Sequence, residues 1–155
     1  MKKILPLMAV CLITSAAAFA APSTSPVFQI RLVLDAPSGD SEPMTVVSKE
    51  RKEVVNVQKP VLLDQTALKS AGVRTDESGH ARIEVTFTAE GRKRFADITH
   101  EKLGQRLAII IDGSLYCAPT IKAEIPGGKA EISGSFSKEE ANALAAKIIE
   151  AIKKH

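Results

Sequence analysis

The stretch RLAIIIDGSLYCAP, residues 106–119, joins an apolar run to an Asp-Gly pair, a thiol and a proline. Asp-Gly between two apolar segments is a strong signal for a type I′ β-hairpin, because both central residues of that turn need positive φ. Folding the chain about Asp112 and Gly113 would place Cys117 opposite Ala108 on the neighbouring strand. The stretch therefore predicts two antiparallel strands and argues against a catalytic acid at Asp112.

Strands are also predicted on both sides of this hairpin. VFQIRLVLD (27–35) and ARIEVTFT (81–88) alternate apolar and polar residues, which is the pattern of a half-buried strand. Two β-branched runs, MTVV and EVVNV, flank the charged turn SKERK, and Pro60 is expected to end the pairing of the second run. After the hairpin, TIKAEI (120–125) and KAEISG (129–134) predict two more strands joined by a Pro-Gly-Gly turn.

Three segments carry helix signals. DQTALKSAG (64–72) predicts a small helix capped by its first residue, and TAEGRKRFADITHEKLG (88–104) predicts a longer helix capped by Thr88. The third helix begins at an S-x-x-E capping box, residues 137–140, and carries an apolar stripe along one face. Strands followed by a helix, twice over, predict an α+β fold in which two main helices pack on one face of an antiparallel sheet.

The N-terminus has the layout of a secretory signal peptide. Two lysines precede an apolar run that ends in Ala-Phe-Ala, so cleavage is expected after Ala20. Residues 21–26 are turn formers and are expected to be a flexible linker, followed by a single domain over 27–155. The alternative, an uncleaved membrane anchor, is disfavoured by Pro6 and by the alanine-rich end. We expect a periplasmic or secreted protein without a transmembrane segment after signal cleavage.

Charge and residue spacing give little support to enzyme chemistry. The net charge of +3 includes the two N-terminal lysines, so the remainder is nearly neutral and nucleic acid is not expected as a partner. His80, His100 and His155 are scattered and form no metal-ligand spacing with Cys117. No paired carboxylates suggest a catalytic dyad, and no family-type signature marks Cys117 as a nucleophile. The sequence therefore predicts a non-enzymatic protein with no metal and no cofactor, and an enzyme that uses Cys117 and His100 is kept as a third alternative.

Two features at the end of the hairpin keep more than one interpretation. Cys117 is interpreted as a small buried side chain, with an intermolecular disulfide as the alternative. Tyr116, Pro119 and Ile121 lie where the chain leaves the hairpin, where an aromatic residue and a proline can form part of a binding groove. The alternative for these three is core packing and strand edge. We take them as candidate polypeptide-binding residues.

Three long motifs occur in the order and spacing of one known family. They are ARIEVTFTAEGRKRFADIT, LGQRLAIIIDGSLYCAPTI and IPGGKAEISGSFSKEEANALA, and VFQIRLVLD is similar to a strand that precedes them in that family. Together they resemble the head of the first periplasmic domain of SecD, a subunit of the bacterial protein-export translocase. The resemblance is weakest between residues 36 and 80. Cys117 stands where the family usually has a small polar residue such as Ser.

The resemblance implies a non-enzymatic domain on the outer side of the cytoplasmic membrane that contacts unfolded polypeptide emerging from the translocon. In SecD, membrane helices couple this head to the proton gradient, and the present sequence shows none after its N-terminal segment. We therefore expect an exported module that binds extended or partly unfolded polypeptide. The alternative is a structural or regulatory module that docks on a folded envelope protein or dimerises.

Overall fold

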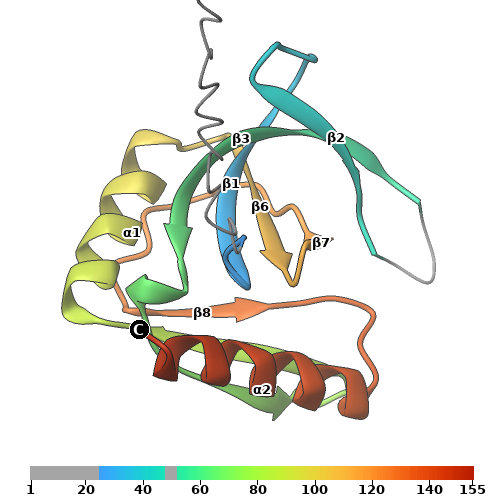
Figure 1. The fold of residues 1–155 in the computed structure, drawn as a ribbon, viewed down its shortest axis with the longest axis vertical. Helices are drawn as coiled ribbons and strands as arrows, with labels where there is room; N and C mark the ends of the chain where they lie inside the picture. Colours follow the sequence, from blue (N-terminus) through green and yellow to red (C-terminus); the bar gives the residue numbers. More distant parts are fainter. Residues whose placement is uncertain (1–24, 48–51) are drawn as a thin grey trace, which may run out of the picture.

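The computed structural model of the protein describes residues 25–47 and 52–155. The predicted signal peptide, its cleavage after Ala20 and most of the predicted linker lie outside these residues. The described chain contains eight strands, two α-helices and a short 3₁₀ segment, η1 (Gln65–Ala67). The predicted α+β class is confirmed, with the antiparallel strands divided between two sheets (Figure 1). Among the described residues, no helix has the length and apolar character needed to cross a membrane.

The first sheet is curled and nearly closed. Its strand order is β2 (Ser41–Thr45), β3 (Val54–Asp64), β1 (Phe28–Leu34), β6 (Arg106–Ile111) and β7 (Ser114–Cys117). Just beyond β2, Val46 forms a bridge with Leu115 of β7, and the Val47 N–H donates to the Leu115 carbonyl at 2.7 Å. The two outer strands therefore meet, and the sheet forms a small barrel (Figure 1).

Strand β6 explains why the run LAIII is apolar at every position. Leu107, Ile109 and Ile111 face the main core between the two sheets. Ala108 and Ile110 face a second apolar cluster inside the curled sheet. A strand buried on both faces gives a continuous hydrophobic run instead of an alternating one.

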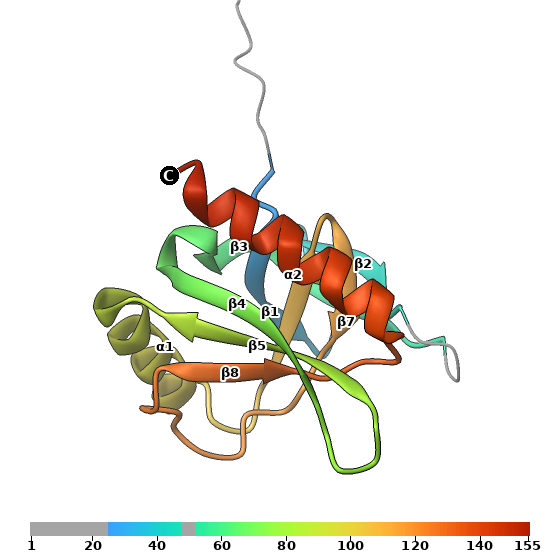
Figure 2. The same ribbon diagram turned by 90° about the horizontal axis from the view of Figure 1, so that it is seen from below.

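The second sheet has the order β4 (Leu68–Thr75), β5 (Ala81–Phe87) and β8 (Lys129–Ile132). Its inner face contributes alternate residues of β5 to the main core. Helix α2 (Lys138–Lys153) packs mainly against β4 and β5, and α1 (Ala89–Glu101) contacts η1, β3 and β5. Figure 2 shows the three strands side by side, with α2 running along β4.

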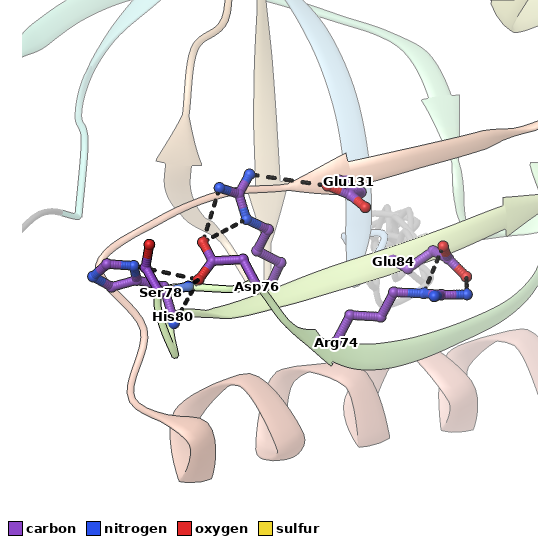
Figure 3. A network of polar contacts seen from close by, with 7 residues as sticks. Arg74, Asp76, Ser78, His80, Glu84 and Glu131 are labelled. Atoms are coloured by element: carbon purple, nitrogen blue, oxygen red, sulfur yellow. Dashed lines mark hydrogen bonds and ion pairs between the residues drawn. The ribbon is translucent and has the colours of Figure 1, made fainter.

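The outer face of this second sheet carries charged side chains that are partly exposed to solvent (Figure 3). The strand register places Arg74 opposite Arg82 and Glu84 opposite Glu131, and like charges in such positions repel. The side chains instead pair diagonally: Arg74 Nε lies 2.9 Å from Glu84 Oε2, and Arg82 Nη1 lies 3.9 Å from Glu131 Oε2. Arg82 also donates to Asp76 in the β4–β5 turn at 3.0 Å. The face is therefore a balanced polar surface that closes off one side of the core.

The predicted hairpin turn is confirmed, and its predicted register is wrong by one residue. Asp112 and Gly113 have φ values of 50° and 77°, as a type I′ turn requires. Ile110 pairs with Leu115, but the next pair joins Ile109 to Cys117, so Cys117 does not face Ala108. An extra residue in β7 forms a bulge at this point, which a count from the turn cannot foresee.

Three other expectations are corrected by the observed strand pairing. Pro60 lies inside β3, where the β1–β3 ladder is irregular between Val57 and Val61, so a missing N–H disrupts no regular pair. Residues 64–72 are helical only in η1, because the chain from Leu68 onward pairs with β5. Residues 120–125 form no strand and make only an isolated bridge between Thr120 and Arg106.

Candidate functional site

An apolar cavity of about 450 Å³ opens between the two sheets, beside the outer strand β8. Its volume falls in the range of small-molecule and side-chain binding sites. The segment 118–128, which connects β7 to β8, forms one wall, and Figure 2 shows it running beside β8 on the side away from β5. We call this space the β8 groove. It is lined by Phe28, Ile30, Val85, Phe95, Thr99, Leu107, Ile109, Pro119, Thr120, Ile121, Lys122, Ala123, Ile125, Lys129, Ala130, Glu131 and Ile132.

The backbone of β8 turns unpaired groups toward this groove. The Phe87 N–H donates to the Gly128 carbonyl at 2.9 Å, and the same register pairs Val85 with Ala130. In an antiparallel ladder, alternate residues exchange hydrogen bonds with one neighbour and the residues between them face the other side. The N–H and C=O groups of Lys129 and Glu131 therefore point away from β5, along the edge that borders the groove.

The segment 118–128, which forms the wall opposite β8, is held at its N-terminal end by backbone hydrogen bonds. The Leu107 N–H donates to the Pro119 carbonyl at 3.0 Å, and the Ile121 N–H donates to the Gln105 carbonyl at 2.8 Å. The Gly104 N–H in turn donates to the Ile121 carbonyl at 2.9 Å. Ile121 is buried in the main core, so this part of the wall is an extension of the first sheet.

Beyond Ile121 the wall is held to helix α1. The Ile125 N–H donates to Thr99 Oγ1 at 3.0 Å, and His100 Nδ1 lies 3.3 Å from Glu124 Oε2. Thr99 is buried, and its hydroxyl also lies within hydrogen-bond distance of the Phe95 carbonyl, at 2.9 Å. A single hydroxyl group thus links the inner face of α1 to the wall of the groove.

One end of the groove closes where β7 approaches the residue after β8. The Ser133 backbone N–H donates a hydrogen bond to the Cys117 sulfur. Ser133 is the next outward-facing position after Lys129 and Glu131, so the sulfur takes up the N–H that follows the β8 edge. Burial raises the pKa of the Cys117 thiol to about 12, and the hydrogen bond offsets only part of this effect. The thiol is therefore a packing group at neutral pH and a poor nucleophile.

A second, smaller hollow follows on from this closed end. Its volume is about 290 Å³, and it lies between the N-terminal part of α2 and the rings of Tyr116 and Phe136. The two ring centroids are 5.3 Å apart and the rings are tilted by 39°. Burial raises the pKa of Tyr116, so its hydroxyl is neutral at ordinary pH. A shallower hollow that includes Cys117 and Pro119 joins the two cavities.

The structure does not gather the three predicted binding residues into one patch. Ile121 is buried, with 5% of its surface exposed, and lines the β8 groove. Pro119 borders both the β8 groove and the shallow hollow beside it. Tyr116 lines the second, smaller hollow next to Phe136. The three residues therefore mark successive points along one row of cavities.

In the described part of the chain, the candidate nucleophile Cys117 and the candidate base His100 have separate partners. The cysteine contacts the Ser133 amide, whereas His100 pairs with Glu124, so the structure gives no support to a Cys–His pair. Across residues 25–47 and 52–155, no three His, Cys, Asp or Glu side chains are grouped to hold a metal ion. What the site presents is apolar surface next to an unpaired strand edge.

Sequence reasoning missed Thr99 and Ile125 as parts of this site. Thr99 lies within the predicted helix 88–104, where nothing in the sequence distinguishes a buried threonine from an exposed one. Ile125 belongs to the predicted strand 120–125, and that prediction gives no reason to expect its side chain in the lining of a groove. The phenyl ring of Phe136 was missed because the loop before the capping box carries no periodic pattern.

Residues 41–151 match the family model described as SecDF, P1 head subdomain. The chain belongs to the SecDF P1 head family. SecD of Leptotrichia buccalis is 49% identical to it over 86 residues, which are 56% of this chain and 21% of that protein. SecDF of Thermus thermophilus is 43% identical over 86 residues, again 56% of this chain and 12% of that protein. The P1 head chain thus spans about a fifth, or less, of these relatives.

Solved structures of SecDF have the same fold. The crystal structure of SecDF in its super-membrane-facing form matches with a TM-score of 0.64 at 30% identity, over 79% of this chain and 18% of that chain. A structure of SecDF, a membrane component that enhances protein export, matches with a TM-score of 0.61 at 29% identity. That match covers 83% of this chain and 62% of the other.

Proposed function

We propose that this P1 head is a non-enzymatic module that binds extended segments of non-native polypeptide outside the cytoplasmic membrane, in connection with protein export. Its relatives are subunits of the protein translocase. The observation that carries the proposal is the edge of β8, whose outward-facing backbone groups border an apolar cavity of about 450 Å³.

Strand addition explains how one site can accept many sequences. An extended chain that pairs with β8 gains affinity from backbone hydrogen bonds, which do not depend on its side chains. Every second side chain of the added strand points to the same face. Those on the inner face would enter the apolar groove beside Pro119 and Ile121, and the Tyr116–Phe136 hollow would take one apolar side chain further along.

A proline substitution at the outward-facing position of β8 tests this mode of binding. Glu131→Pro removes an N–H that points away from β5, so the β5–β8 ladder keeps its hydrogen bonds while strand addition is blocked. Glu131→Thr is the matched control, because both variants lose the 3.9 Å contact with Arg82 and only one loses the N–H. The probe is fluorescein-labelled, reduced and carboxymethylated α-lactalbumin, which stays unfolded, and the readout is fluorescence anisotropy.

We expect the native protein and Glu131→Thr to bind the probe with similar affinity and Glu131→Pro to bind at least about tenfold more weakly. Circular dichroism and thermal melting establish that both variants are folded. Equal affinity of all three folded proteins would exclude strand addition at β8, and no binding by the native protein would overturn the proposal as a whole.

The alternative use of the same edge is pairing between two copies or docking on one folded envelope protein. An unpaired strand edge is a ready template for another strand of any origin. Mass measurement of the purified protein at the concentrations of the binding assay separates the cases. A discrete dimer that Glu131→Pro dissociates would favour self-association over polypeptide binding.

A further inference from the structure

Residues 122–127, which we call the strap, lie between two well-fixed points. Ile121 is buried before them and Gly128 is buried after them, whereas all six positions of the strap are exposed. Ile121 exchanges hydrogen bonds with Gly104 and Gln105, and the Gly128 carbonyl accepts from Phe87. A short exposed segment with fixed ends and few buried contacts belongs to the least stable part of a fold.

Only its middle is tied to the body of the protein by contacts that the structure describes. One is the 3.0 Å hydrogen bond from the Ile125 N–H to Thr99 Oγ1, and the other is the pair between His100 and Glu124. The side chains of that pair are 70% and 47% exposed, so the pair adds little to stability. The hydrogen bond from the Ile125 N–H to the buried Thr99 hydroxyl is therefore the main latch.

The C-terminal end of the strap can act as a hinge. Gly127 has no atom within 4 Å of the place of a β-carbon, and as a glycine it has no side chain to restrict its φ and ψ angles. Gly128 has a φ of +72°, in the region that other residues rarely adopt. Rotation here would swing Ile125 outward while Ile121 stays in the core.

The strap also narrows the space that an added strand needs. Ala123 and Ile125 line the β8 groove from the side opposite the β8 edge. No backbone hydrogen bond in the described chain joins the strap to β8, so the two move apart without breaking a ladder. A strand paired with β8 would lie about 4.8 Å from it, and its side chains would meet Ile125.

We propose that the strap is a gate of the β8 groove, latched to α1 by Thr99, and that it opens to admit an extended polypeptide. This inference rests on the proposed function and adds its regulation. Opening exchanges the Thr99 bond for water, and the bound chain then holds the strap outward. Binding is thus coupled to a small displacement beside helix α1.

The latch is tested first by Thr99→Val, which keeps the shape of the buried side chain and removes the acceptor for Ile125. Loss of one net hydrogen bond shifts the open–closed equilibrium by about fivefold. Association of the labelled carboxymethylated α-lactalbumin, followed by stopped-flow anisotropy, should accelerate by up to that factor. Thr45→Val on β2, at an exposed position far along the sequence from the strap, should leave the rate unchanged.

The second test uses a covalent cross-link to hold the strap in its closed position against α1. His100→Cys and Glu124→Cys are combined with Cys117→Ser, and a short bis-maleimide joins the new thiols, which replace side chains 3.3 Å apart. We expect association at least tenfold slower in the cross-linked protein than in the same protein capped with N-ethylmaleimide. Binding at identical rates in the cross-linked, capped and Thr99→Val proteins would overturn the gate and leave the proposed function standing. Absence of binding in the native protein would overturn the proposed function itself.

Discussion

Replacing Gly91 by alanine should destabilise the protein, although helix propensity alone predicts the opposite. Gly91 lies in the first turn of α1, where alanine is favoured over glycine by up to about 1 kcal/mol. A β-carbon built at this position would lie 2.1 Å from the Ala67 carbonyl oxygen and 2.9 Å from its carbon. Backbone atoms at these distances cannot be avoided by a side-chain rotation.

The clash falls on a junction that holds α1 to the rest of the fold. The Ala67 carbonyl accepts from the Thr88 N–H at 2.9 Å, and Thr88 Oγ1 caps the helix by accepting from the Gly91 N–H at 3.0 Å. Overpacking typically costs about 1–3 kcal/mol, and loss of the Thr88 bond adds about 1 kcal/mol. Subtracting a gain of about 1 kcal/mol in propensity leaves an expected loss of about 1–3 kcal/mol in the free energy of unfolding.

Urea denaturation followed by circular dichroism measures this loss. Gly72→Ala is the matched control, because Gly72 also lies within a regular element and has no atom within 4 Å of its would-be β-carbon. We expect Gly72→Ala to be neutral or slightly stabilising, since it lowers the entropy of the unfolded chain. Gly91→Ala as stable as the native protein would show that α1 can shift from η1 at little cost, and the reasoning would be refuted.

Two other expectations concern ionisable groups. Alkylation of Cys117 by iodoacetamide at neutral pH should be at least about 100-fold slower in the folded protein than in urea, since its pKa of about 12 keeps the thiolate scarce; equal rates would contradict the burial of this thiol. The pKa of Asp76 is lowered from 3.8 by the His80 backbone N–H and by Arg82, so its stabilising effect is present above pH 3.8 and is lost as the pH falls below it. Asp76→Asn should therefore lower the melting temperature at pH 7 and have a smaller effect at pH 2.5, and a constant difference at both pH values would exclude this charge effect.

The sequence was most informative where one short segment determines its own conformation. The Asp112-Gly113 turn, the Thr88 cap and the capping box that begins α2 were all predicted and are all confirmed. Each depends on hydrogen bonds or φ angles within four residues. The register beyond the turn was wrong because a bulge near Cys117 depends on packing between strands.

The errors arose where distant segments compete for the same residues. Residues 64–72 carry helix signals, yet from Leu68 the chain becomes β4 because β5 offers a partner along its full length. Residues 120–125 show the alternation of a strand. In the structure, however, Ile121 forms hydrogen bonds with the residues that precede β6, and the chain after it runs to α1, where Ile125 bonds to Thr99. Of the predicted polypeptide-binding residues, Pro119 and Ile121 line the β8 groove and Tyr116 lines the smaller hollow, and their role in binding stays a prediction. The groove itself could not be predicted, because it exists only once α1, β8 and the strap are brought together.

The same topology gives β8 surroundings that differ from those of the other outer strands. The outer strands of the first sheet meet at Val46 and Leu115, and β4 packs against α2. Folded proteins protect an exposed edge with charged side chains, and Lys129 and Glu131 alternate along β8 with residues of the core. These charges disfavour pairing with another folded edge, which would bring a second row of charges close to the first. A single flexible chain could instead turn its apolar side chains into the groove and its polar ones toward Lys129 and Glu131, so under the proposed function the edge would favour extended polypeptide over a preformed sheet.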